Sequence, residues 1–230
     1  MKARPERWHV PLDDRLRSLT RLLTWLSPAF PTGAYAHSHA LEWAVQAGDV
    51  RDEHDLLRWL DDVLRFGAGR TDAILLRHAH RAATADALAE VAELAAAAQP
   101  CRERRAETLG QGGAFALAAR VWGAPLLDGL EEIAYPVAVG ALARAQDVDE
   151  DSAALGLLHA FAANLVSAAV RSVPLGQTAG LRVLAALEPG LHEAVAQTGD
   201  AGLDELGGAC FRSDIAAMRH ETQYTRLFRT

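Results

Sequence analysis

Lysine is almost missing from this sequence: Lys2 is the only one, so arginine accounts for 22 of the 23 basic residues. Chemistry that needs an interior lysine, such as a Schiff base or the phosphate clamp of a P-loop, is therefore close to excluded. Cysteine is also scarce, because Cys101 and Cys210 are the only two and stand far apart. They form neither a CxxC pair nor a disulfide framework, which indicates a reducing compartment.

The sequence also lacks a basic excess and a secretory signal. Its formal net charge is −7 and its pI is about 5.7, whereas broad nucleic-acid binding requires a basic face. The first residues contain no apolar core of a signal peptide. Residues 152–170 contain no Asp, Glu, Lys or Arg, but polar Ser152, His159, Asn164 and Ser167 interrupt them. We predict a buried central helix there rather than a membrane span.

Catalytic motifs are missing as well, since the sequence contains no GxSxG, no Walker A loop and no GxGxxG that follows a strand. The histidines do not form a chelating pattern. His37 and His39, like His78 and His80, are two residues apart, which separates their side chains by about 200° on a helix. We therefore predict no catalytic, cofactor-binding or metal site.

Alanine and leucine dominate the sequence, and no convincing run of residues alternates between apolar and polar. We therefore predict an all-α fold. Asp52 can cap a helix whose apolar stripe runs from Leu56 to Leu64. Further helices are expected at about 16–26, 37–48, 71–82, 85–98, 102–121, 130–145, 151–172, 177–187 and 203–224. Proline and glycine separate several of them, among others at Pro189-Gly190. The prediction is a single domain of about ten helices around a buried central helix, with an irregular N-terminal arm.

The predicted central helix carries one line of polar side chains. Asn164, Ser167 and Arg171 lie at i, i+3 and i+7 on an otherwise apolar cylinder. A buried arginine needs a carboxylate or several carbonyl oxygens as partners. The line is either an internal network that fixes the register of the helix or a polar groove that opens onto a partner.

The last twelve residues, 219–230, combine charge with apolar side chains. They carry three arginines and one glutamate, a local formal charge of +2 in an acidic protein. In a helix, Tyr224, Leu227 and Phe228 would lie on one face beside Arg226. Chain termini are usually polar and frayed unless something holds them. Two interpretations are open: the tail docks onto a partner, or it is a final helix that packs on its own domain.

Four blocks of sequence, in the same order, resemble the urease accessory protein F (UreF) family. They are LSPAFPTGAYAHSHALEW at 26–43, CRERRAE at 101–107, ANLVSAAVRSVPLGQT at 163–178 and MRHETQYTRLFR at 218–229. The resemblance covers about residues 16–230. One departure is Ala40, where the family motif usually has glycine. Alanine is favourable there in a helix but strained if φ is positive.

The resemblance implies an all-α, cytoplasmic, non-catalytic chaperone that forms a homodimer. Such proteins bind urease accessory protein D, called H in some species, and together they recruit the GTPase accessory protein G. The complex inserts nickel into apo-urease in a step that depends on GTP hydrolysis. The resemblance implies no cofactor of the chain's own, and the composition predicts neither nucleic acid nor membrane as a partner.

The resemblance also assigns expectations to single positions. Tyr35 and Arg226 match family positions linked to GTPase binding, and the family's tail becomes ordered against the D/H partner. We therefore divide the chain into an arm at 1–15, a helical domain at 16–218 and a docking tail at 219–230. Deletion of that tail is expected to abolish partner binding and to leave stability nearly intact. The predicted partner-binding residues are Tyr35, Arg219, His220, Glu221, Tyr224, Arg226, Leu227 and Phe228.

Two alternatives to an assembly chaperone remain at this point. Nine histidines and many carboxylates are compatible with a helical enzyme that binds a metal or a cofactor. A helical scaffold that has no link to urease is the other. Metal content and co-purifying partners would separate the three hypotheses.

Overall fold

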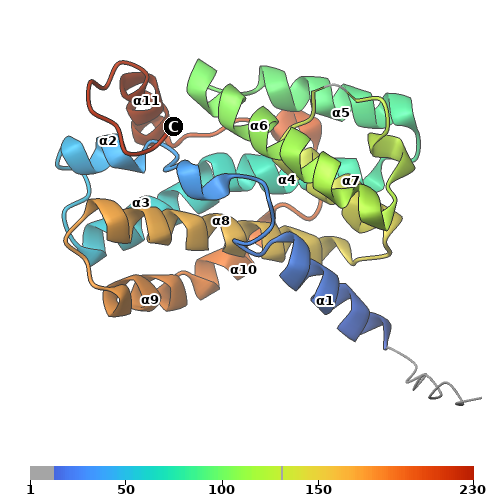
Figure 1. Ribbon diagram of the computed structural model, residues 1–230, viewed down its shortest axis with the longest axis horizontal. Helices are drawn as coiled ribbons and strands as arrows, with labels where there is room; N and C mark the ends of the chain where they lie inside the picture. Colours follow the sequence, from blue (N-terminus) through green and yellow to red (C-terminus); the bar gives the residue numbers. More distant parts are fainter. Residues whose placement is uncertain (1–12, 131) are drawn as a thin grey trace, which may run out of the picture.

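A computed structural model describes residues 13–130 and 132–230 of the chain, which form α-helices and short 3₁₀ turns and no β-strand (Figure 1). The predicted all-α fold is confirmed. Residues 1–12 of the predicted arm and Glu131 lie outside the described residues. The α-helices are α1 (Asp14–Trp25), α2 (Leu41–Gln46), α3 (Glu53–Phe66), α4 (Ala68–Arg81), α5 (Ala85–Ala97), α6 (Arg102–Ala119), α7 (Tyr135–Ala145), α8 (Glu150–Ser172), α9 (Gln177–Ala186), α10 (Glu188–Gln197) and α11 (Phe211–His220).

Local sequence signals explain where many of these helices begin and end. The Asp52 carboxylate accepts a hydrogen bond from the backbone N–H of Asp55 and so caps α3, as predicted. Gly48 follows the end of α2 with φ +79°, the left-handed conformation that glycine adopts at little cost. Asp149 caps α8 by accepting the N–H of Ser152.

One helix contradicts the sequence interpretation. Pro189 and Gly190 were predicted to separate helices, but they lie in the first turn of α10, which begins directly after α9. Proline is compatible with the first turn of a helix because its missing N–H would have no partner there. A Cβ on Gly190 would come within 2.6 Å of the Asp61 carboxylate, so the glycine permits α10 to pack closely on α3.

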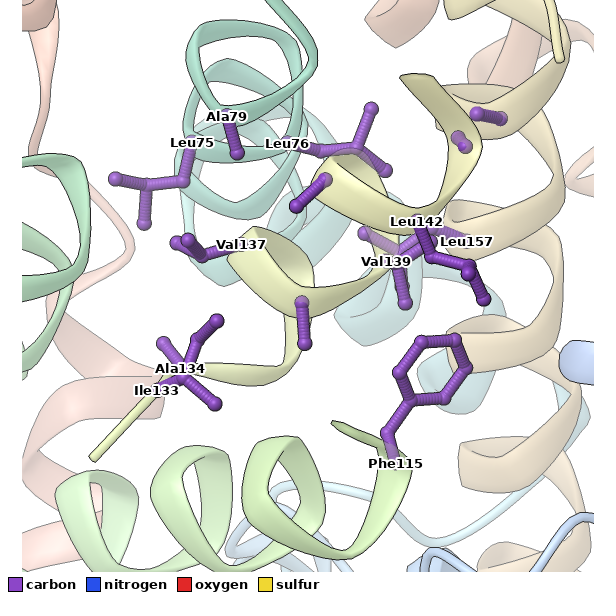
Figure 2. Close-up of a cluster of buried hydrophobic side chains, with 14 of the residues drawn as sticks. Leu75, Leu76, Ala79, Phe115, Ile133, Ala134, Val137, Val139, Leu142 and Leu157 are labelled. Atoms are coloured by element: carbon purple, nitrogen blue, oxygen red, sulfur yellow. The ribbon is translucent and has the colours of Figure 1, made fainter. Parts of the chain in front are cut away.

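The most enclosed helices are α4 and α7, which cross at very short distance. A Cβ on Gly140 of α7 would overlap the Leu76 carbonyl oxygen of α4. Around this crossing, side chains from α6, α7 and α8 converge, with Phe115 and Leu142 fully buried and Leu157 nearly so (Figure 2). Close packing of this kind fixes the relative positions of α6 and α8, the two helices that support the candidate site.

The long apolar helix predicted at 151–172 is α8, which runs through the middle of the molecule (Figure 1). By length and composition α8 could cross a membrane, but half of its apolar window is buried inside the fold. It packs on α2, α4, α7, α9 and α10. Its apolar side chains are therefore accounted for by the protein core.

Candidate functional site

The C-terminal residues 221–230 form no helix, and we call this irregular segment the strap. Helix α11 ends at His220, not near residue 224 as predicted, and the last residues follow an irregular path beside α2 (Figure 1). Tyr224, Leu227 and Phe228 consequently do not share a face. The side chains of Tyr224 and Leu227 are exposed, whereas that of Phe228 is only 5% exposed and joins the core under α2 and α8.

Hydrogen bonds join the end of the strap to the first loop of the domain, residues 27–40. The backbone N–H of Ser38 donates to the Thr230 carbonyl oxygen at 2.7 Å, and the Arg229 N–H donates to the Ala36 carbonyl oxygen at 2.8 Å. The Ser38 hydroxyl also donates to the Thr230 carbonyl oxygen. The segments that contain Tyr35 and Arg226 therefore lie side by side, although they stand at opposite ends of the sequence.

Two buried carboxylates hold the middle of the strap. The Glu42 carboxylate accepts the backbone N–H groups of Leu227 and Phe228 at 2.7 and 3.1 Å. The Glu103 carboxylate accepts the Arg226 guanidinium at 2.6 Å and faces Nδ1 of the fully buried His220 ring at 2.6 Å. Buried carboxylates are costly unless they are paired, so these contacts explain why the chain leaves the helix after His220.

A third carboxylate, that of Glu107, accepts the Thr230 hydroxyl at 2.7 Å and the Arg104 guanidinium at 2.5 Å. Burial alone would raise the pKa of the Glu107 carboxyl, but Arg104 and the neighbouring His39 ring hold that pKa below its usual range. Burial, assisted by Arg104, lowers the pKa of His39 to about 4, so that ring is neutral at pH 7. Glu107 is therefore an ionised anchor for the chain terminus.

Sequence reasoning missed Glu42, Glu103 and Glu107 as site residues. All three stand inside the blocks that carry the family resemblance, and the two on α6 are four residues apart on one helix face. That spacing is the signal that could have found them. Their shared partner, the strap, comes from the far end of the chain and leaves no local trace in the sequence.

The predicted polar line on α8 contacts the first loop. The Asn164 amide donates to the His37 carbonyl oxygen at 3.2 Å, and both Nη atoms of Arg171 lie 3.1 Å from the Tyr35 carbonyl oxygen. The Ser167 side chain is exposed, and its carbonyl oxygen accepts the Nε–H of Arg171. Two of the three residues thus fix the loop on which Tyr35 stands.

A cavity of about 320 Å³ lies beneath the first loop. Its polar lining includes Asn164 and Ser167 from α8 as well as Arg104, Asp72 and Tyr135. Burial raises the pKa of the Asp72 carboxyl to about 7 and raises the pKa of Tyr135 above its ordinary value. The cavity wall therefore combines apolar side chains, such as those of Leu157 and Phe161, with a polar part in which Arg104 and Glu107 form an ion pair.

The first loop ends in an unusual backbone conformation. His39 and Ala40 have φ values of +57° and +63°, and Ala40 is buried. This is the region where a side chain is strained, by about 1–2 kcal/mol per residue. At the position where the family motif usually has glycine, φ thus lies in the left-handed region that favours glycine. Ala40 is therefore strained rather than helical.

The outer surface beside the strap carries a line of large apolar side chains. Phe211, Ile215 and Met218 lie at i, i+4 and i+7 on α11, and their exposed fractions are 68%, 55% and 49%. We call these three residues the α11 face. With exposed Tyr224 and Leu227 they add five large apolar groups to one region of the chain. The sequence interpretation placed only the last two in the site.

The other predicted partner-binding residues divide into exposed ones on the protein surface and buried ones beneath it. Tyr35 is 66% exposed, Arg219 is exposed, and the Arg226 side chain is 38% exposed while bound to Glu103. Glu221 is partly buried, and its carboxylate accepts the Glu103 N–H at the start of α6. His220 and Phe228 are buried, so in this structure they support the surface from below.

A second hollow, whose lining is mainly apolar, lies beside α1. Helix α1 projects from the body of the molecule (Figure 1), and a groove of about 1360 Å³ separates it from α8, α9 and α10. Leu19 and Leu23 of α1 and Leu181 of α9 line this groove and are more than half exposed.

Comparison with known proteins identifies the family of this chain. A family model described as UreF matches residues 50–188. A urease accessory protein UreF from Bradyrhizobium sp. is 50% identical over 221 residues, which cover 93% of this chain and 92% of that protein. The protein of the same name from Xanthobacter autotrophicus is 52% identical over 222 residues, covering 93% of this chain and 91% of its own. That from Rhodopseudomonas palustris is 49% identical over 243 residues and covers both chains completely. This chain therefore belongs to the UreF family.

Proposed function

We propose that this chain is a non-catalytic urease maturation chaperone of the cytoplasm. Together with accessory protein D/H it recruits the GTPase accessory protein G and regulates it, and the complex inserts nickel into apo-urease as GTP is hydrolysed. Membership of the UreF family and near-complete alignment with urease accessory proteins support this function. The single structural observation that carries it is the apolar surface of the α11 face and the strap.

The α11 face is the proposed docking surface for D/H. Its three side chains are too large and too exposed to be part of this chain's own core. Arg219 is exposed in the last turn of α11, and Arg226 follows in the strap, where it pairs with Glu103. Interfaces are typically built from such an apolar centre with charged residues at its rim. Tyr224 and Leu227 extend the same surface along the strap.

Tyr35 and Arg226 are the proposed contacts for the GTPase. Their segments are joined by the backbone bonds between the first loop and residues 229–230. A partner that touches Tyr35 can therefore also touch the strap. Because D/H docking on α11 would involve the same strap, the two partners would contact one continuous region of this chain.

Replacement of Ile215 and Met218 by aspartate is the experiment that tests this function. We expect the double variant to bind D/H at least about tenfold more weakly, because two apolar contacts near the centre of an interface become buried charges. Pull-down of D/H, and then of the GTPase, measures this. Leu117→Asp on α6 is the matched control, since Leu117 is equally exposed and lies outside the surface.

The same variants are then placed in a urease operon whose own copy of this gene is deleted. At limiting nickel, the wild-type chain and Leu117→Asp should restore urease activity, whereas Ile215→Asp/Met218→Asp should not. Full nickel occupancy of urease with no copy of this gene would refute the proposed function. Equal D/H binding by the double variant and the wild type would refute the proposed docking surface.

The groove beside α1 is the proposed homodimer interface. The exposed leucines of α1 lie along one helix face, and the groove beside them is apolar and large enough for a partner helix. Leu19→Asp/Leu23→Asp is expected to convert the dimer to a monomer in sedimentation equilibrium. Val121→Asp, which is exposed outside the groove, should remain dimeric. A dimer that persists in the leucine variant would place the interface elsewhere.

A further inference from the structure

The guanidinium of Arg171 lies between two aromatic rings that come from opposite ends of the chain. Its Cζ atom is 3.7 Å from the ring centre of Tyr35 and 4.5 Å from the ring centre of Phe228. Both rings are within the distance at which a cation is attracted to an aromatic face. One side chain from the last turn of α8 therefore contacts both segments of the proposed GTPase surface.

Hydrogen bonds fix the plane of this guanidinium. The Nε–H donates to the Ser167 carbonyl oxygen one turn earlier, and Nη1 and Nη2 both lie 3.1 Å from the Tyr35 carbonyl oxygen. Only arginine combines a planar group for stacking with donors in a fixed fork. Lysine would keep the charge but would lose the plane and most of these donors.

The position of the Tyr35 ring depends on this contact. The ring is 66% exposed, and it stands in a 3₁₀ turn of three residues, Ala34–Ala36, which follows a proline- and glycine-rich stretch. A short turn of this kind does not by itself fix an aromatic ring. On the other side, Phe228 is the buried anchor of the strap.

We propose that Arg171 is a positioning residue that locks the first loop and the strap into one docking surface. The guanidinium holds the Tyr35 ring outward for a partner and at the same time seats Phe228. In this way the last turn of α8 sets the relative position of Tyr35 and Arg226. The consequence for partner binding rests on the proposed function, whereas the locking of the two segments does not.

Two variants of the full chain, Arg171→Lys and Arg171→Met, test this proposal through amide hydrogen exchange. The amides of Ser38 and Arg229 report on the lock, because each donates to the other segment. Both variants should exchange at least about tenfold faster at these two amides, while the amides of α4 keep their protection. A merely destabilised protein would instead lose protection everywhere.

The matched control is Arg182→Met on α9, which removes an exposed ion pair with Glu53 and no ring contact. It should leave both amides unchanged. Unchanged exchange at Ser38 and Arg229 in Arg171→Met would overturn the proposal. So would wild-type exchange in Arg171→Lys, because charge alone would then be sufficient.

The affinity for the GTPase is the second measurement. The complex of each variant with D/H is titrated with the GTPase. We expect Arg171→Lys and Arg171→Met to bind the GTPase about tenfold more weakly and D/H unchanged. Faster exchange with unchanged GTPase affinity would overturn the role of Arg171 in docking. If the wild-type complex itself binds no GTPase, the proposed function fails, and the exchange result alone then decides whether Arg171 locks the segments.

Discussion

Deletion of residues 219–230 is expected to destabilise the folded protein by about 5 kcal/mol or more, which is comparable to the whole stability of a typical domain. The sequence alone predicted the opposite, a removable tail. The structure argues against that expectation because the tail contains buried residues, among them His220, Phe228 and Thr230.

The largest part of this loss comes from carboxylates. Without the tail, Glu42 loses two backbone donors, Glu103 loses Arg226 and His220, and Glu107 loses the Thr230 hydroxyl. Removal of one partner from a buried charge typically costs about 3–5 kcal/mol. Burial of the Phe228 side chain contributes about 2 kcal/mol more. Glu107 keeps Arg104, which limits the cost at that residue.

Urea unfolding followed by circular dichroism measures this loss. The control is Tyr224→Ala/Leu227→Ala, which removes the exposed side chains of the tail and keeps its backbone and anchors. That double variant should change the free energy of unfolding by less than about 1 kcal/mol while it weakens D/H binding. An unchanged midpoint for the deletion would show that the strap contributes no stability to the fold.

The deletion and the Tyr224→Ala/Leu227→Ala variant also distinguish the contribution of the tail to stability from its contribution to partner binding. The strap contains both kinds of side chain, with Tyr224 and Leu227 exposed and Phe228 buried. The Glu42 carboxylate holds the backbone at Leu227 and Phe228, so Phe228 turns inward beside the exposed Leu227. The two interpretations of the tail that the sequence left open are therefore not exclusive. The tail packs on its own domain and still presents apolar side chains to a partner.

Helix positions were largely predictable from the sequence because their causes are local. The Asp52 cap and the stripe that ends at Leu64 are set by neighbours within a few residues, and α3 lies where they indicate. One exception is α11, which covers only Phe211–His220 of the predicted 203–224. Another is α10, because a proline in the first turn of a helix cannot be told from a proline that ends one by the sequence alone. Whether a helix follows depends on α3, against which Gly190 packs.

The candidate site was predictable only in part, because its contacts join distant segments. Spacing identified the line Asn164, Ser167 and Arg171, but nothing local shows that the first loop lies over it. The tail was recognised as unusual from its composition, yet its irregular path depends on Glu42 and Glu103. Ala40 shows the same limit, since its sequence context did not decide between helical and positive φ.

Arg77→Met is the second substitution with a large expected effect, a loss of about 3 kcal/mol of stability. Arg77 lies on α4 with 2% of its surface exposed. Its guanidinium binds Glu150 at 2.6 Å and Asp151 at 2.7 Å on α8, and the Val195 carbonyl oxygen at 2.8 Å on α10. Methionine fills similar volume, but the Val195 carbonyl oxygen then keeps only the Thr198 hydroxyl as a donor, and the Glu150 carboxylate keeps only Arg81.

Urea titration of Arg77→Met measures this effect, and Arg182→Met is the matched control. Arg182 also pairs with a glutamate, Glu53, but the pair is exposed, and such pairs contribute less than about 1 kcal/mol. A loss in Arg77→Met no greater than in the control would mean that water replaces the guanidinium at no cost.

The pH dependence of Arg77→Met separates charge from hydrogen bonding. Burial alone would raise the pKa of the Glu150 carboxyl, but Arg81 and Arg77 together hold it below its usual range. A carboxyl with a depressed pKa stabilises the fold above its unfolded pKa, near 4.5, and this contribution is lost as pH falls through the folded value. The difference in stability between wild type and Arg77→Met should therefore shrink below about pH 4. A difference that stays constant down to pH 3 would assign the loss to the Val195 and Thr198 hydrogen bonds that join α4 to the end of α10.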